Sequence, residues 1–491
     1  MSRSISAIQI ANLAALPVLG RIGGTRFWPM SRALARASRR PLAERKADQL
    51  RSLNALLQSA ARNVPMIRER LSEKVAVEGL RSLDDIQSLP ITDKSDMMSG
   101  FPDRVVDAKR DRTDWKFVST SGTVSRVVTV KDFQRRDLER AAAIHSLSCG
   151  THYRPGLRFI QIPPNICNIV CGEGATNEDE SFRSELGHWL RNLASKGSND
   201  MADLRGAFER RIVYRTRILS PLAPAGTQVD AERFESFWNR IRREKPFLLH
   251  ALPEYLYLLA EWAIEEGRPP LGVPRIIPMG GNTTPYMRAR IVEGLGGTFT
   301  DFYGTAELGP VAFECRPGDG LRTIMEMFLI EVVRKGRPAA PGELGKLLIT
   351  DLANQAMPFL RYQVGDAAVW WPAPEDSRDQ SPRIRVVGRL DEVLEGSDGE
   401  PIAPETLRDQ LYTRGDCLAF SLRARDGRRL QIDYVPRGDD IGSERVIEAV
   451  RPLLHPDFRI KARTVGNIPA EASGKFRFIR SESNGVDLLD S

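Results

Sequence analysis

The 491-residue sequence predicts an α/β protein with two domains: a large N-terminal domain, residues 1–388, with β-sheets flanked by helices, and a small α+β domain, residues 389–491. Three observations lead to this prediction. The chain is too long for one ordinary domain. Between about 100 and 330, short apolar runs alternate with helical stretches, as in α/β proteins. After Gly388 the pattern changes to a compact mixture of strands and helices.

The first seventy residues form a basic helical lead-in. They contain thirteen Arg or Lys and three acids, which is a net charge of +10. Because the whole chain has a net charge of +7, the remaining residues carry a net charge of −3. Three interpretations stay open: a solvated helical face, weak contact with an anionic membrane surface, or a targeting segment. No nucleic-acid-binding module accompanies the charge, so we expect no nucleic acid as a partner.

Helices are expected at the start of the large domain. Leu50, Leu53, Leu56 and Leu57 recur at helical spacing within residues 31–71, and Pro65 interrupts this pattern. Farther along, Leu89-Pro90-Ile91-Thr92-Asp93-Lys94 is typical of a turn into a helix. We expect Thr92 to cap that helix.

Strands are expected in two groups. The first comprises residues 158–162, 247–252 and 274–279, and the second of these leads through Pro253 into a helix that ends near Glu265. The other group is more purely β and comprises residues 328–333, 345–350 and 367–371. The polar stretch 172–203 is typical of an insertion.

Composition indicates a soluble protein with a real core. Hydrophobic residues make up 41% and charged residues 27% of the chain. The five cysteines are odd in number and form no C-x-x-C pair, which argues against a disulfide framework and for a reducing compartment. No stretch reaches the roughly 18 uncharged apolar residues of a membrane span. We therefore expect a cytoplasmic protein.

The first of four chemical motifs is rich in hydroxyl residues around a glycine: Ser119-Thr120-Ser121-Gly122-Thr123. A glycine lets backbone N–H groups approach an anion closely, and the hydroxyls add donors. Such a loop can cradle a phosphate, although similar clusters also occur in ordinary turns.

The second motif is Asp301-Phe302-Tyr303-Gly304-Thr305-Ala306-Glu307. Its aromatic ring can stack on a base, and its terminal carboxylate can hold Mg²⁺ that bridges phosphates. A strand that ends in a turn, with a Glu in the first turn of a helix, is the plainer interpretation.

The remaining motifs are Arg361-Tyr362-Gln363-Val364-Gly365-Asp366, then Gly388-Arg389-Leu390-Asp391-Glu392 with the later Ala472-Ser473-Gly474-Lys475. An Asp after a glycine turn can accept hydrogen bonds from two ribose hydroxyls. A Lys on a glycine-bearing loop can reach a phosphate as a mobile point charge. Alone, each also suits a β-turn or an exposed surface lysine.

In this order and at these separations, the motifs together resemble the adenylate-forming superfamily of acyl-CoA synthetases, adenylation domains and luciferases. Within it, the chain is most similar to the phenylacetate–CoA ligase group. Tyr303-Gly304-Thr305-Ala306-Glu307 is the sharpest match. The resemblance runs over most of the chain and includes residues 56–68 and 89–94, Gly280-Gly281-Asn282, residues 311–315 and residues 357–362.

The resemblance implies an activity, its cofactors and the site residues. ATP activates a carboxylic acid, aryl or related, as an acyl-AMP, and the acyl group then passes to coenzyme A; Mg²⁺ assists. Lys475, Glu307 and Thr305 are the implied catalytic residues, and Glu307 also holds Mg²⁺. The small domain is mobile and turns on a hinge at Asp391. The implied ATP- and AMP-binding residues are Ser119, Thr120, Ser121, Gly122, Thr123, Gly280, Gly281, Asn282, Tyr303, Gly304, Asp366 and Arg389.

The phosphate loop departs from the family pattern "SSGTTGxPK". After Gly122-Thr123 the chain reads Val124-Ser125-Arg126, without the second Thr, the second Gly and the Pro-Lys. Two alternatives therefore stay open: acyl transfer to a carrier protein or another nucleophile, or a degenerate nucleotide-binding relative without catalysis. A homodimer also stays open.

Overall fold

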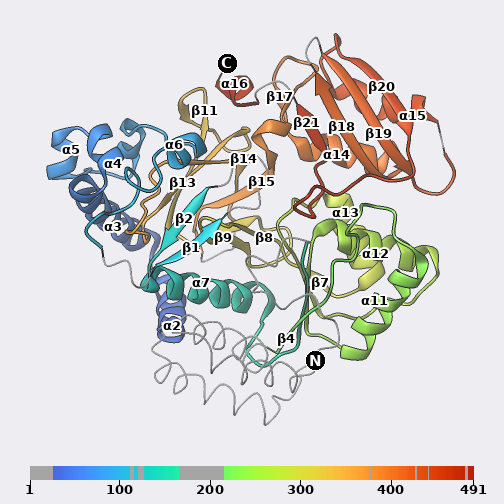
Figure 1. Cartoon of the computed structure of the whole chain (residues 1–491), viewed down its shortest axis with the longest axis horizontal. Helices are drawn as coiled ribbons and strands as arrows, with labels where there is room; N and C mark the ends of the chain where they lie inside the picture. Colours follow the sequence, from blue (N-terminus) through green and yellow to red (C-terminus); the bar gives the residue numbers. More distant parts are fainter. Residues whose placement is uncertain are drawn as a thin grey trace, which may run out of the picture.

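The structure is a computed structural model that describes residues 26–110, 115–119, 127–164, 215–374, 379–425, 428–440, 442–481 and 485–490. It confirms the predicted α/β fold, with sheets flanked by helices and a mixed α+β region at the C-terminal end (Figure 1). No helix within these residues is long and apolar enough to cross a membrane.

The N-terminal helices are α2 (Phe27–Ala37), α3 (Leu42–Asn63), α4 (Pro65–Arg70), α5 (Glu73–Glu78) and α6 (Lys94–Ser99). The break at Pro65 is confirmed, since α3 ends at Asn63 and Pro65 opens α4, where a missing N–H does no harm. The predicted cap at Thr92 was wrong by one residue. Asp93 caps α6, because its side chain accepts a hydrogen bond from the Asp96 N–H. The Asp96 side chain in turn accepts one from the Asp93 N–H.

A five-stranded parallel sheet follows, in the order β4 (Thr216–Ile218), β3 (Phe159–Ile162), β5 (Leu248–Ala251), β6 (Arg275–Pro278), β7 (Thr298–Phe299). The strands predicted near 158, 247 and 274 are thus confirmed. Their helices are α7 (Phe133–Thr151), α11 (Ala231–Glu244), α12 (Pro253–Glu265) and α13 (Pro285–Leu295). Helix α11 shows why they pack here: Phe234, Phe237, Trp238 and Ile241, at helical spacing, are all buried.

The second large sheet has eight antiparallel strands, in the order β12-β11-β13-β14-β15-β10-β9-β8. They are β8 (Phe302–Thr305), β9 (Gly309–Glu314), β10 (Leu321–Thr323), β11 (Phe328–Arg334), β12 (Arg337–Pro338), β13 (Gly345–Asp351), β14 (Tyr362–Trp371) and β15 (Arg383–Arg389). A separate hairpin pairs β1 (Lys116–Ser119) with β2 (Val128–Lys131). The expected β region from 328 onward is confirmed. The glycine turn expected before Asp366 is not formed. Both residues lie within β14, where Gly365 has φ +91°.

The C-terminal region contains a four-stranded sheet, in the order β20 (Arg459–Thr464), β19 (Arg429–Pro436), β18 (Cys417–Arg425), β21 (Ile479–Ser481). It also has α14 (Pro404–Thr413), α15 (Ser443–Val450) and the short pair β16 (Leu394–Glu395) and β17 (Pro401–Ile402). Arg389 still belongs to the eight-stranded sheet, and α16 (Gly485–Asp490) returns to it through an ion pair between Asp490 and Lys346. The division into domains at 388/389 stays a prediction.

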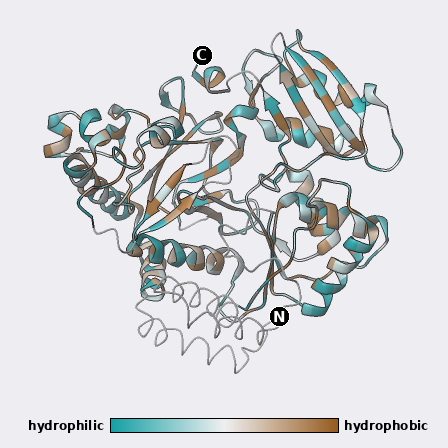
Figure 2. Cartoon of the chain, in the orientation of Figure 1, coloured by the Kyte–Doolittle hydropathy of each residue, from teal (hydrophilic) through white to brown (hydrophobic). Residues whose placement is uncertain are grey.

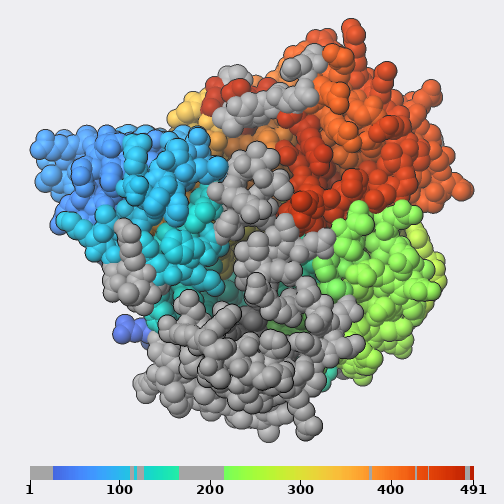
Figure 3. Space-filling view, viewed as in Figure 1, coloured from blue at the N-terminus to red at the C-terminus, as the bar shows by residue number. Residues whose placement is uncertain are grey.

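The C-terminal region packs closely on the helices of the five-stranded sheet. In the space-filling view its red residues lie against the green part of the chain (Figure 3), and Arg437 donates a hydrogen bond to Tyr257 of α12. One buried hydrophobic cluster includes Tyr257 of α12, Met287 of α13, and Leu411 and Phe478 of the C-terminal region. Apolar residues gather along the strands and on the covered sides of the helices (Figure 2). This packing determines where the loop that carries Lys475 lies.

Candidate functional site

The centre of the site is a buried carboxylate, Asp366, held by two donors. Tyr303 Oη donates to Asp366 Oδ2 at 2.6 Å, and Arg389 Nη1 donates to Oδ1 at 3.0 Å. Asp366 and Arg389 are cross-strand partners on β14 and β15. Tyr303 lies on the edge strand β8. In the order of the sheet, three strands lie between β8 and β14, namely β9, β10 and β15. The sheet must therefore curl strongly to bring the second, third and fourth motifs together.

Burial and charge keep the two donors to Asp366 protonated. Burial, and then the Asp366 carboxylate, raise the pKa of Tyr303 well above its usual value, so the phenol stays a donor. Burial disfavours the charged form of Arg389, but Asp366 and Asp391 outweigh it and raise its pKa. A carboxylate oxygen accepts two hydrogen bonds, so Asp366 keeps acceptor sites for two further donors such as ribose hydroxyls.

A second carboxylate lies beside this group. Glu307 is 5% exposed, and its Oε1 accepts a hydrogen bond of 3.3 Å from Tyr362 Oη. Thr305 Oγ1 accepts from the Leu308 N–H at 3.1 Å and so holds the turn between β8 and β9. Gly304 lies in β8 just before that turn, and a Cβ there would lie 2.5 Å from the carbonyl oxygen of Gly309, so the close approach of β9 requires glycine. The turn therefore positions Glu307.

The glycine pair predicted to bound the nucleotide follows strand β6. Gly280 has φ +65°, a left-handed conformation that favours glycine. A Cβ on Gly281 would lie 3.0 Å from the ring of Pro253, which opens α12. Asn282 is held by the eight-stranded sheet and by the C-terminal region: its Nδ2 donates to Val386 O at 2.6 Å, and Arg408 donates to its carbonyl at 2.9 Å. These contacts make the loop a rigid wall.

Lys475 enters this site from the C-terminal region. A Cβ on Gly280 would lie 3.2 Å from Lys475 Nζ, so the ammonium lies close against the backbone of this loop and a side chain there would press on it. Burial lowers the pKa of Lys475, while the carboxylates of Asp366, Glu254 and Glu307 oppose this shift and Arg389 adds to it. Among the described residues, these charged groups act on the Lys475 ammonium through charge alone, with no hydrogen bond to it among the causes of the shift. The ammonium is thus surrounded by acids at the wall of the site, without being tied to one of them.

The hinge residue and the phosphate loop complete the predicted set. Asp391 lies next to two cations, Arg477 through a hydrogen bond and Arg389 Nε at 3.6 Å, directly after β15. Ser119 is the last residue of β1. Thr120, Ser121, Gly122 and Thr123 lie outside the described residues, so their prediction stays as it was. Seven predicted residues, from Gly280 to Lys475, therefore meet in one cluster: Gly280, Tyr303, Glu307, Asp366, Arg389, Asp391 and Lys475.

Two members of this cluster were assigned no specific chemical role from the sequence. Tyr362, which bonds Glu307, stood in a quoted motif but was given no role. Glu254 lies in the first turn of α12 and is 7% exposed. Burial raises its pKa, and the charges of Arg408 and Lys475 oppose this shift without cancelling it. A single Glu inside the apolar run 252–260 was the available signal for it.

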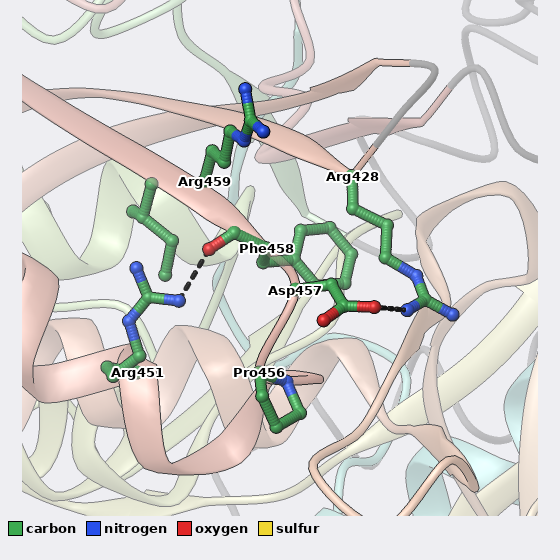
Figure 4. A pocket seen from close by; sticks show the side chains of 7 residues that line it. Arg428, Arg451, Pro456, Asp457, Phe458 and Arg459 are labelled. Atoms are coloured by element: carbon green, nitrogen blue, oxygen red, sulfur yellow. Dashed lines mark hydrogen bonds and ion pairs between the residues drawn. The ribbon is translucent and has the colours of Figure 1, made fainter.

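A separate surface hollow lies in the C-terminal region and contains none of these residues. Figure 4 shows Arg428, Arg451, Asp457, Phe458 and Arg459 around it. Arg428 pairs with Asp457 at 2.7 Å, and Arg451 donates to the carbonyl of Phe458. Two of its three guanidinium groups are therefore already occupied, and the candidate site remains the cluster around Asp366.

No family model matches the chain. Among curated proteins, it is 26% identical over 360 residues to a phenylacetate–coenzyme A ligase of Escherichia coli, covering 72% of each chain. It is 28% identical over 368 residues to the phenylacetate–coenzyme A ligase of Thermus thermophilus, again covering 72% of each. These relatives agree with the resemblance stated from the motifs.

Solved structures show the same fold. A 2-hydroxyisobutyryl-CoA ligase in its postadenylation state, in complex with an acyl-AMP, aligns with a TM-score of 0.65 at 18% identity and covers 92% of both chains. The same ligase with coenzyme A in its thioesterification state aligns with a TM-score of 0.54 and covers 93% of both. An anthranilate CoA ligase aligns with a TM-score of 0.52 at 13% identity, covering 75% of this chain and 67% of the other.

Proposed function

We propose that this chain, a homologue of the phenylacetate–coenzyme A ligases in the adenylate-forming superfamily, activates a carboxylic acid with ATP and transfers the acyl group to coenzyme A. The observation that carries the proposal is the cluster itself. Segments from four distant parts of the sequence bring a tyrosine, two carboxylates and a loop lysine to one glycine wall. Stability alone does not require a buried lysine among acids, because such burial is costly.

In the first half-reaction, the substrate carboxylate attacks the α-phosphorus of ATP and pyrophosphate leaves. Negative charge spreads over the α-phosphate and the departing oxygens, so the site must supply positive charge. We assign this role to Lys475, whose ammonium has no fixed partner and can meet the phosphate and carboxylate oxygens. We assign the ribose hydroxyls to Asp366, whose orientation Tyr303 and Arg389 hold.

The residues present also fit a magnesium ion. Glu307 is a buried carboxylate with one weak hydrogen bond, and Mg²⁺ in nucleotide sites is held by one or two carboxylates together with substrate phosphates. No group of three potential ligands occurs within the described residues, so the phosphates of ATP would complete the shell. When bound there, Mg²⁺ would neutralise part of the charge on the phosphates.

In the second half-reaction, a thiol attacks the acyl-AMP carbonyl and AMP leaves. Coenzyme A is the acceptor that the relatives' names and the coenzyme A complex of a structural neighbour support. The comparisons give no support for a carrier protein. We further propose that the region after Arg389 turns about Asp391 between the two half-reactions.

The test is pyrophosphate release from Mg-ATP against a panel of aryl and aliphatic acids, with and without coenzyme A. We expect release that depends on the acid and rises with coenzyme A. Lys475→Ala is the matched control, because it removes the ammonium and leaves the wall of the site in place. Absence of release with every acid, in a protein that still binds ATP, would refute the proposal in favour of a non-catalytic nucleotide-binding protein.

A further inference from the structure

Just before the loop that carries Lys475, the C-terminal region makes another contact with the part of the chain that forms the five-stranded sheet. Residues 225–228, between β4 and α11, meet Asn467 and Ile468, which follow β20. We call these two segments the clasp. Thr227 N–H donates to Ile468 O at 3.0 Å, and Ile468 N–H donates to Thr227 Oγ1 at 2.9 Å. The two residues are thus bonded in both directions.

Asn467 adds three further bonds to the clasp, one of which its Oδ1 accepts from the Thr227 hydroxyl at 3.4 Å. Its Oδ1 accepts from the Gln228 N–H at 3.0 Å, and its Nδ2 donates to Ala225 O at 3.3 Å. Gly226, with φ +138°, makes this approach possible, because a Cβ there would lie 2.4 Å from Asn467 Oδ1. The two segments of the clasp lie more than 230 positions apart in sequence. Their contact depends on the backbone conformation of Gly226 as well as on hydrogen bonds.

Only six residues separate the clasp from Lys475. The loop between them is also closed on itself, because Glu471 N–H donates to Lys475 O at 2.8 Å and Gly474 N–H to Glu471 O at 2.7 Å. Beyond Lys475, Phe478 is buried, and its carbonyl accepts a hydrogen bond of 2.6 Å from the Leu422 N–H of β18. The C-terminal side of the loop is thus fixed within its own sheet and by Phe476, whose ring packs edge-on against Tyr255 of α12. Among the described residues, the clasp ties the N-terminal side to the helices of the five-stranded sheet.

We propose that Thr227 and Asn467 are positioning residues for adenylation: the clasp holds the Lys475 loop at the Gly280 wall while acyl-AMP forms, and opens for thioester formation. This inference rests on the proposed function, because it assigns Lys475 to the first half-reaction. It predicts that loss of the clasp slows acyl-AMP formation and spares the second half-reaction, since the ammonium is not needed there. A residue with only a structural role would slow both.

The experiment compares Thr227→Val, which removes the hydroxyl while keeping the shape, with Thr227→Ser, which keeps the hydroxyl. Thr227→Val removes two hydrogen bonds, the one from the Ile468 N–H and a longer one to Asn467 Oδ1. Because the loss of each corresponds to about a three- to tenfold effect, we expect acid-dependent pyrophosphate release to fall by about threefold or more for Thr227→Val and to recover for Thr227→Ser. Thioester formation from supplied acyl-AMP and coenzyme A should stay within about twofold of wild type. Thr413→Val is the matched control, because Thr413 bonds only within α14.

A second measurement does not depend on activity. Hydrogen–deuterium exchange should show protected amides at Thr227, Gln228 and Ile468 in the full wild-type chain, and Asn467→Ala should raise their exchange while the core of the C-terminal sheet stays protected. Equal slowing of both half-reactions, an unchanged adenylation rate in folded Thr227→Val, or unprotected wild-type amides would each overturn the inference. If wild type releases no pyrophosphate with any acid, the proposed function fails, and the exchange comparison still decides whether the clasp exists.

Discussion

The carboxylate of Asp366 offers the sharpest test of the site, through the substitution Asp366→Asn. The side chain keeps its shape but loses its charge. Arg389 cannot accept a hydrogen bond, so the new amide oxygen must face Arg389 and the new NH₂ group must face Tyr303 Oη. The packing of Asp366, which is 8% exposed, is thereby preserved, and the change isolates the charge.

The magnitude follows from the two contacts and the proposed ligand. The Arg389 side chain is 44% exposed, so loss of its ion pair costs about 1 kcal/mol or less. A hydrogen bond to a charged group is worth about 1.5–3 kcal/mol. If Asp366 accepts from the ribose, loss of its charge should raise the KM for ATP by about tenfold to a hundredfold.

The assay is ATP-dependent pyrophosphate release, with ATP titrated at a saturating concentration of the acid identified as substrate. Thermal unfolding of the same variant separates stability from binding. A raised KM for ATP with a small loss of Tm is the expected result. A lowered Tm with an unchanged KM for ATP would show that Asp366 only links Tyr303 to Arg389, and the ribose assignment would be wrong.

Three further outcomes are expected. Lys475→Ala should slow pyrophosphate release by roughly a hundredfold to a thousandfold and leave thioester formation from supplied acyl-AMP nearly unchanged; equal slowing of both would remove Lys475 from its role. Burial raises the pKa of Glu392 to about 7, so its native carboxyl keeps a proton that the unfolded chain, with the ordinary value of 4.5, releases. Native stability therefore falls as pH rises through this window, and Glu392→Gln should gain up to about 3 kcal/mol relative to wild type between about pH 4.5 and about pH 7; a pH-independent difference in urea unfolding would contradict this. Arg437→Gln breaks the hydrogen bond that ties the C-terminal region to Tyr257 of α12 and leaves Glu261 with one cation fewer, so it should lower the free energy of unfolding by about 3 kcal/mol. Arg463→Gln is the comparison and should lower it much less, because the Arg463 side chain is exposed to solvent.

Local features of this protein could be predicted from the sequence because they depend on neighbouring residues. Apolar runs bounded by glycine and proline located β3, β5 and β6, and the leucine spacing located α3. The motifs identified Tyr303, Glu307, Asp366, Arg389 and Lys475 by residue type and order. The cap at Thr92 failed by one residue, because Asp and Thr are both good caps and the reciprocal bond with Asp96 decided between them.

The meeting of these residues could be decided only by the tertiary structure. Three strands separate Tyr303 from Asp366 in the eight-stranded sheet, and their 2.6 Å bond depends on how strongly that sheet curls. Glu254 became part of the site because α12 begins where the Gly280-Gly281 turn packs on it. Asn467 and Gly226 show the same limit: nothing near either residue in sequence indicates the other, since their contact is formed by the packing of one folded region on another.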